Sequence, residues 1–198
     1  MTRFEKPQAL KRSDYIAPPD LITYLAAGTK VQMSDSFWLR AIQDFDYCDS
    51  VINQKECSGK SWLFKIINAV ADLDPNFFEA HYYGALALTI IISDYEGASA
   101  IFDKAVVHFP KSWMLFYAAG YHALVEEKNK IKAAKLYLEA GNLGAPSWVP
   151  LMAGKLAADA GDIDYSAQIL EGMIAMNQQP EYVERLKKKL EQKKKDIK

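Results

Sequence analysis

The sequence predicts an all-α protein in which about four helix pairs stack into a solenoid, with a capping helix at each end. Apolar residues recur at intervals of three and four in nearly every segment, which is the period of an amphipathic helix. Strand signals, such as alternating Val, Ile and Thr residues or Asn-Gly turns, are almost missing. Pro75, Pro110 and Pro146 lie 35 and 36 residues apart, which is typical of repeated helix pairs.

The composition is that of a globular protein of about one domain. Of the 198 residues, 50% are hydrophobic and 25% are charged, which excludes a wholly disordered chain. The net charge of −1 gives no global sign of nucleic-acid binding, and we expect none. A transmembrane helix needs about 18 apolar residues, and the longest apolar stretch, residues 84–92, is about half that, so we expect no transmembrane segment.

The solenoid is expected over residues 20–179, after a flexible arm of residues 1–19 that is polar and broken by prolines. A short helix over residues 20–25 is expected to cap the first end. The first helix pair is irregular, with one helix around residues 37–41 and the other over 62–67, running to Asp74 and Pro75.

The turn between these two helices is about nine residues too long and carries Cys48 and Cys57. Two cysteines at this spacing fit neither a disulfide scaffold nor a zinc site. We interpret them as ordinary thiols, with a single disulfide as the alternative if the protein is exported. The turn itself is interpreted as a surface loop, and an insertion with a function at one edge of the solenoid is the alternative.

Each of the next three pairs has small residues where helices approach closely and large residues that fill the gaps. The second pair carries Gly84, Ala85, Ala98, Phe102 and Ala105, and ends at Pro110. The third carries Ala119, Gly120, Ala133, Tyr137 and Ala140, and ends at Pro146. The fourth carries Ala153, Gly154, the turn Gly161–Asp162, Ser166 and Ala167, with Leu170 and Met173 as its less regular members. Helix N-caps are expected at Ser34, Ser61, Asp94, Ser112, Asn129 and Ser147.

These blocks resemble the tetratricopeptide repeat (TPR) family over roughly residues 34–178, specifically in the second and third pairs and with departures in the other two. The resemblance implies a right-handed α-solenoid whose first helices line a concave groove for an extended or helical peptide. Residues 25–41 are also similar, more loosely, to the start of uncharacterised bacterial TPR proteins of gliding and predatory bacteria.

The resemblance also places particular residues on the groove, counted from the small pair of each repeat. They are Tyr82, Leu86, Thr89 and Ile90, then Met114, Tyr117, Tyr121 and Leu124, then Trp148, Leu151, Lys155 and Asp159, with Leu39, Gln43 and Asp46 from the first pair. The middle of this set is aromatic and apolar. We therefore expect a protein partner that offers an apolar peptide or an amphipathic helix, with tyrosine and tryptophan as anchors.

Two further expectations concern this groove. TPR grooves that grip acidic chaperone tails have lysine and asparagine at positions where this chain has Tyr82, Leu86, Tyr117 and Tyr121, so we expect no such binding. The alternative to a partner is that the N-terminal arm, the C-terminal helix or a second copy of the chain covers the groove, the last giving a homodimer.

The C-terminal segment, residues 180–198, is expected to form a basic helix with a narrow apolar stripe of Val183, Leu186 and Leu190. Residues 181–198 carry eight basic and four acidic side chains. We interpret the segment as a capping helix with a polar outer face. The alternative is a basic handle for an acidic partner, anionic lipid or nucleic acid.

No pattern of catalytic, metal-ligating or cofactor-binding residues is found, so we expect neither an enzyme nor a bound cofactor. Gly59-Lys60-Ser61 is similar to the end of a phosphate loop, but Gln54 stands where that motif needs a glycine. His81, His108 and His122 include no pair with the i, i+4 spacing of a helical zinc site. We expect His81 to be a hydrogen-bonded, partly buried core histidine.

The sequence thus predicts a non-enzymatic adaptor or scaffold that binds another protein. The looser likeness suggests motility, pilus or polarity machinery, with a small GTPase as one partner. We expect a cytoplasmic location, because the N-terminus shows no signal peptide. The alternatives are a self-associating dimeric module, or a cell-envelope or secretion accessory whose N-terminal signal or anchor was removed, which would place it in the periplasm.

Overall fold

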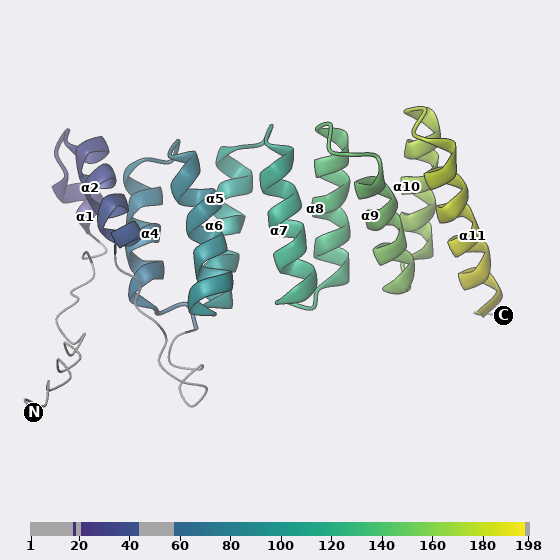
Figure 1. Cartoon of the computed structure of the whole chain (residues 1–198), viewed down its shortest axis with the longest axis horizontal. Helices are drawn as coiled ribbons and strands as arrows, with labels where there is room; N and C mark the ends of the chain where they lie inside the picture. Colours follow the sequence, from purple (N-terminus) through teal and green to yellow (C-terminus); the bar gives the residue numbers. More distant parts are fainter. Residues whose placement is uncertain (1–17, 19–20, 44–57, 197–198) are drawn as a thin grey trace, which may run out of the picture.

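The protein is all-helical over the part of the chain that the structure describes. A computed structural model describes residues 18, 21–43 and 58–196, in which helices account for 78% of the residues and no strand occurs. Figure 1 shows the helices standing side by side in chain order along the longest axis of the molecule. The predicted arm except Pro18, and the turn with Asp46, Cys48 and Cys57, lie outside the described residues.

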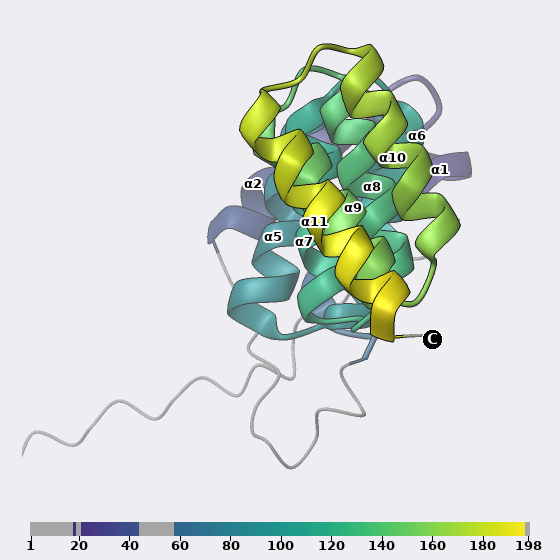
Figure 2. The ribbon, with the colours of Figure 1, turned by 90° about the vertical axis from the view of Figure 1, so that its right-hand side faces the viewer.

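Neighbouring helices pack in pairs, and a final helix covers the last pair. The elements are α1 (Ile22–Leu25), α2 (Lys30–Gln43), α4 (Trp62–Leu73), α5 (Phe78–Ala87), the π-helical turn η2 (Leu88–Ile92), α6 (Tyr95–His108), α7 (Trp113–Val125), α8 (Lys130–Asn142), α9 (Trp148–Asp159), α10 (Ile163–Ala175) and α11 (Pro180–Asp196). The pairs are α2 with α4, α5 with α6, α7 with α8 and α9 with α10, and α11 packs on both α9 and α10. Seen along the row, α6, α8 and α10 lie to one side of α5 and α7, and α11 crosses the end of the row diagonally (Figure 2). The prediction of an all-helical chain with paired neighbours is confirmed, and the solenoid and its right-handedness stay predictions.

Side-chain caps begin several helices where the sequence predicts them. Ser61 accepts a hydrogen bond from the Phe64 amide at the start of α4. Asp94 and Asn129 cap α6 and α8 in the same way. Ser112 and Ser147 precede α7 and α9 without a side-chain cap bond.

The expected N-cap at Ser34 is wrong. The helix α2 begins at Lys30, so Ser34 lies inside it and is buried. The Ser34 hydroxyl donates to the Val70 carbonyl oxygen in α4 at 3.4 Å. A hydroxyl that reaches a carbonyl of its neighbour in this way holds the two helices of the first pair together.

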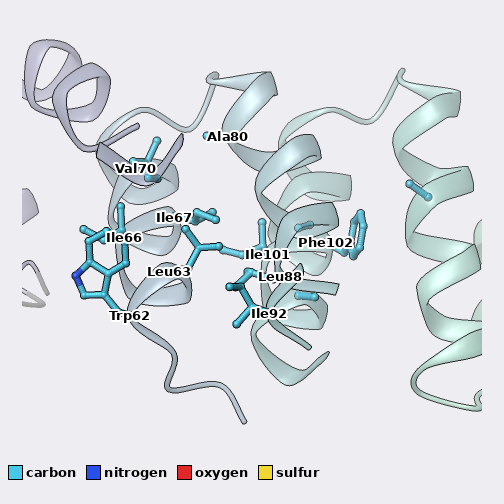
Figure 3. Packing of buried hydrophobic residues seen from close by; sticks show 14 of the residues in the cluster. Trp62, Leu63, Ile66, Ile67, Val70, Ala80, Leu88, Ile92, Ile101 and Phe102 are labelled. Carbon is cyan, nitrogen blue, oxygen red and sulfur yellow. The ribbon is translucent and has the colours of Figure 1, made fainter. Parts of the chain in front are cut away.

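The large residues predicted for the second helices fill the core. Phe102 in α6 is 2% exposed and Tyr137 in α8 is fully buried. One apolar cluster joins α2, α4, α5, η2 and α6 to the start of the third pair, and a second joins α7 to α11. Figure 3 shows Leu63 and Ile67 pointing from α4 into the first cluster, where they meet Leu88 and Ile101. Burial of such side chains contributes about 1.5–3 kcal/mol each.

Glycines let successive helices approach closely. A Cβ at Gly84 in α5 would lie 2.8 Å from Ile67 Cγ2 in α4, and one at Gly120 in α7 would lie 3.0 Å from the Tyr137 ring in α8. A Cβ at Gly154 in α9 would overlap Leu186 of α11. The sequence signal of small residues therefore corresponds to contacts between neighbouring helices.

The helix α11 closes the C-terminal end of the row. Leu186 and Leu190 are buried against the second cluster, as the apolar stripe predicts. Lys189 and Lys193 pair with Asp159 at the end of α9, at 2.7 and 3.6 Å. The hydrogen bond from Lys189 holds the pKa of Asp159 below its ordinary value. Part of the basic charge of α11 is thus used inside the molecule.

The variant Gly154→Ala should lower the free energy of unfolding by about 1–3 kcal/mol, because the new Cβ collides with Leu186. Urea denaturation followed by circular dichroism measures the change. Gly172→Ala in α10 is the control, since nothing lies within 4 Å of a Cβ there. It should raise stability by up to about 1 kcal/mol, because alanine favours a helix over glycine. Equal stabilisation by both variants would contradict tight packing of α11 on α9.

Candidate functional site

The candidate site is the outward side of the first helices α2, α5, α7 and α9, which we call the first-helix face. It is defined by Leu39 and Ile42 in α2, Tyr82, Tyr83, Leu86 and Ile90 in α5 and η2, Met114, Tyr117, Tyr121 and Leu124 in α7, and Trp148 and Lys155 in α9. Most of these residues are exposed or half-buried.

The helix α7 presents its predicted groove residues most clearly. Met114 is 47% exposed and Tyr121 is 52% exposed. Tyr117 is half-buried, with its ring 5.6 Å from Trp148 in an edge-on contact and 5.4 Å from Tyr137. Leu124 is half-buried against the second cluster. The rings of Tyr117 and Trp148 therefore join α7 to α9 on this face.

In α5 the outward position is one residue later than the prediction. Tyr82 and Leu86 are half-buried against the first cluster, and the Tyr82 ring stacks on Phe78 at 5.6 Å. Tyr83, which the sequence analysis did not select, is 56% exposed, and Ile90 is 73% exposed. Tyr82 and Tyr83 meet edge-on at 5.1 Å. Tyr82 thus supports the exposed ring of Tyr83.

The helix α9 contributes less surface than predicted. Trp148 is 40% exposed, and Lys155 is half-buried. Leu151 is only 5% exposed and belongs to the second cluster, so we correct its placement on the groove to a core position. Rotation of the helix about its axis explains the difference, because packing on α8 and α10 sets which side faces outward.

A hollow of about 270 Å³ opens between α2 and α5, with α4 behind it. Its lining residues are Trp38, Ala41, Ile42, Leu63, Ile67, Tyr83, Gly84 and Ala87. None of them is charged. No sequence pattern indicates this hollow, apart from the short side chains of Ala41 and Ala87 on facing helices.

Charge is absent from the middle of the first-helix face and present on the second helices. Glu79 is the one Asp, Glu, Lys or Arg residue in α5, η2 and α7. Lys104 in α6 pairs with Asp72 in α4 at 2.5 Å, and Lys132 in α8 pairs with Asp103 in α6 at 3.0 Å. These partly exposed pairs contribute up to about 1 kcal/mol each and link successive second helices.

The residues Gly59-Lys60-Ser61 hold an internal carboxylate instead of a phosphate. The Gly59 and Ser61 amides donate to Asp94 at 2.6 and 3.2 Å, and the Ser61 hydroxyl donates at 2.5 Å. Gly59 has a φ of 65°, which favours glycine. Asp94 is fully buried and also caps α6 through the Gly97 amide at 3.0 Å. The anion-binding groups of this loop therefore already have a partner.

His122 is buried between three elements. Its Nδ1 lies 3.0 Å from the Thr89 hydroxyl of η2, and its Nε2 lies 2.9 Å from the Ser99 hydroxyl and 3.1 Å from the Tyr95 carbonyl oxygen of α6. Burial, which disfavours the charged imidazolium, holds the pKa of His122 below its ordinary 6.5. Both ring nitrogens have partners within the protein, so the residue links helix pairs.

His81 is fully buried and has one hydrogen-bonded nitrogen. Its Nδ1 lies 2.9 Å from the Phe77 carbonyl oxygen, while its Nε2 has no hydrogen-bond partner in the described structure. Burial lowers the pKa of His81 as well. The expectation of a core histidine is thus met, with deeper burial and fewer hydrogen bonds than predicted.

Comparison with known proteins adds no relative. Neither the protein-family models, nor the curated proteins, nor the solved structures include a match to this chain.

Within residues 18, 21–43 and 58–196, no three His, Cys, Asp or Glu side chains gather into a group that could hold a metal ion. In the same ranges no helix has the length and apolar character needed to cross a membrane.

The variant Asp94→Ala should lower the free energy of unfolding by about 2–4 kcal/mol, because it leaves buried donors at Gly59 and Ser61 unpaired and removes the cap of α6. Asp162→Ala is the matched control, since Asp162 caps only the Tyr165 amide of α10 and is exposed. We expect a loss of about 1 kcal/mol there. Equal losses in urea denaturation would show that the bonds to residues 59–61 contribute nothing.

The free energy of unfolding should fall as the pH drops below about 6.5. The unfolded chain then takes up protons on His81 and His122, whose pKa values burial lowers in the folded state. The slope of the free energy of unfolding against pH approaches about 1.4 kcal/mol per pH unit for each histidine. Urea denaturation between pH 5 and 8 measures this slope.

The variant His122→Gln should reduce this slope. Met114→Gln, at an exposed position of the same helix, is the control and should keep it. A free energy of unfolding that stays constant from pH 7.5 to 5.5 would contradict the assignment of two buried neutral histidines.

Proposed function

We propose that this protein is a non-enzymatic, TPR-like adaptor that binds a partner protein on its first-helix face. The observation that carries the proposal is the row of exposed apolar and aromatic side chains on successive first helices. Tyr83, Met114, Tyr121 and Trp148 are each at least 40% exposed. Grouped exposed apolar side chains on one face are typical of a binding surface.

The repeated architecture supports a right-handed TPR-like solenoid. Gly84, Gly120 and Gly154 each belong to the pair of small residues in their first helix, and each lies against a neighbouring helix. The second pair is 35 residues long between prolines, one more than the 34 of a TPR. The π turn η2, which takes one residue more than an α-helical turn, is consistent with this extra length.

The chemistry of the face favours an uncharged, apolar segment as the ligand. Tyr117, Tyr121 and Trp148 offer a large contact area with few rotatable bonds, and Tyr82 and Leu124 support their neighbours from below. Lys155 stands at the edge of this surface and can meet a polar group of the partner. An acidic chaperone tail finds no lysine or asparagine in α5 or α7.

The double variant Met114→Ala/Tyr121→Ala tests the proposal. Both side chains are about half exposed, so the variant should fold normally, with helicity and thermal midpoint nearly unchanged. Removal of two anchors should lower the affinity for the partner at least tenfold, which is about 1.4 kcal/mol of binding free energy. The partner is first identified by affinity capture from the native cells, and its affinity is then measured with purified proteins by calorimetry.

A matched control comes from the opposite side of the row. Val107 in α6 and Ile174 in α10 are 72% and 55% exposed, and Val107→Ala/Ile174→Ala removes a similar apolar surface. This control should keep full affinity. Equal weakening by both double variants, or no weakening by the first, would contradict binding on the first-helix face.

A further inference from the structure

We propose that the hollow between α2 and α5 is an anchor pocket that takes one bulky uncharged side chain, such as leucine or phenylalanine, from the partner's peptide segment. This inference rests on the proposed function and specifies its ligand. It assigns a role to a feature outside the predicted groove residues, since none of the eight lining residues belongs to that set.

The floor of the hollow is part of the rigid core. Leu63 and Ile67 in α4 are 1% and 0% exposed, and Leu63 points towards Leu88 and Ile101 (Figure 3). Ile67 fits against Gly84 so closely that a Cβ there would lie 2.8 Å from it. Trp38 packs edge-on against Phe77 at 5.7 Å, which fixes α2 to the residue before α5. The floor of the hollow is therefore part of the packed core, and the hollow opens between α2 and α5.

The lining selects an uncharged occupant. The only side-chain polar groups among the lining residues are the Tyr83 hydroxyl and the Trp38 indole N–H. A carboxylate, an ammonium or a phosphate that entered would lose its water and gain no opposite charge, which is strongly unfavourable. A leucine or phenylalanine side chain would gain about 1.5–3 kcal/mol from full burial.

The size and position of the hollow favour a peptide side chain over a free small molecule. A volume of about 270 Å³ lies below the roughly 300–1,000 Å³ of pockets that enclose a drug-sized ligand. Its rim is formed by Ile42 and Tyr83, which are 47% and 56% exposed. Tyr82 touches Tyr83 and belongs to the same face as Tyr121. A segment anchored in the hollow can therefore continue across α5 onto α7.

The test uses the full chain and N-acetyl amino-acid amides as probes of single side chains. We expect the leucine and phenylalanine amides to shift the NMR signals of Ala41, Leu63 and Ala87 with dissociation constants of roughly 10–100 mM. The lysine and glutamate amides should shift none of them. Ala87→Phe fills the hollow and should lower the affinity for the apolar probes at least tenfold. Ala175→Phe, at the exposed end of α10, should leave that affinity unchanged.

A second variant guards against disturbed folding at Ala87, which also touches the core. Ile42→Asp places a charge on the exposed rim and should likewise abolish binding of the apolar probes. Binding of charged and apolar probes alike, or binding that survives both variants, would overturn the pocket. Displacement of the probes on dimer formation at high protein concentration would also overturn it, because a second copy would then be the occupant.

The outcomes separate this inference from the proposed function. If Met114→Ala/Tyr121→Ala loses the partner while Ala87→Phe and Ile42→Asp keep it at full affinity, the adaptor proposal stands and the anchor pocket fails. If the hollow binds the apolar probes but Met114→Ala/Tyr121→Ala keeps the partner at full affinity, the proposed use of the first-helix face fails.

Discussion

The structure depends on stacking, because no helix pair buries its apolar side alone. The first apolar cluster reaches from Ala41 in α2 to Ala119 in α7, and the second from Ala123 in α7 to Leu190 in α11. Each cluster therefore takes side chains from at least two pairs, and α7 contributes to both. In such a row, stability is shared between neighbours, so each junction matters more than any single helix. The buried stripe of α11 closes the last junction and turns a polar surface outward.

Close approach of the helices governs both the core and the candidate site. Where a glycine meets a large residue, as Gly120 meets Tyr137, the space between two helices is filled. Between α2 and α5, the short side chains of Ala41 and Ala87 leave a hollow above Leu63. The same packing rule thus produces a solid core at one junction and an opening at another. The irregular first pair, with its early start at Lys30, is the place where the pattern of small and large residues is least regular.

Local patterns predicted the local features, and tertiary packing decided the rest. The helix pairs, the burial of Phe102 and Tyr137, and the caps at Ser61, Asp94 and Asn129 follow from spacing and capping chemistry within one or two turns. Ser34 was misplaced because its hydroxyl bonds to Val70, 36 residues away. Tyr83 replaced Tyr82 as the outward ring, and Leu151 turned inward, because neighbouring helices set the rotation of α5 and α9. A hollow depends on the distance between helices, which no periodicity within one helix contains.

The distribution of polar groups explains why the first-helix face suits an apolar ligand. Inside the molecule, Asp94 and His122 each have several hydrogen-bond partners from neighbouring elements, so their burial also holds the pairs in register. On the surface, ion pairs such as Lys104 with Asp72 join the second helices. The middle of the first-helix face has neither such buried polar groups nor ion pairs. Its exposed rings leave apolar area in contact with water, which costs about 25 cal/mol of free energy per Å². A partner that covers these rings recovers that free energy without having to supply a counter-charge, whereas a charged partner would lose hydration and gain no ion pair there.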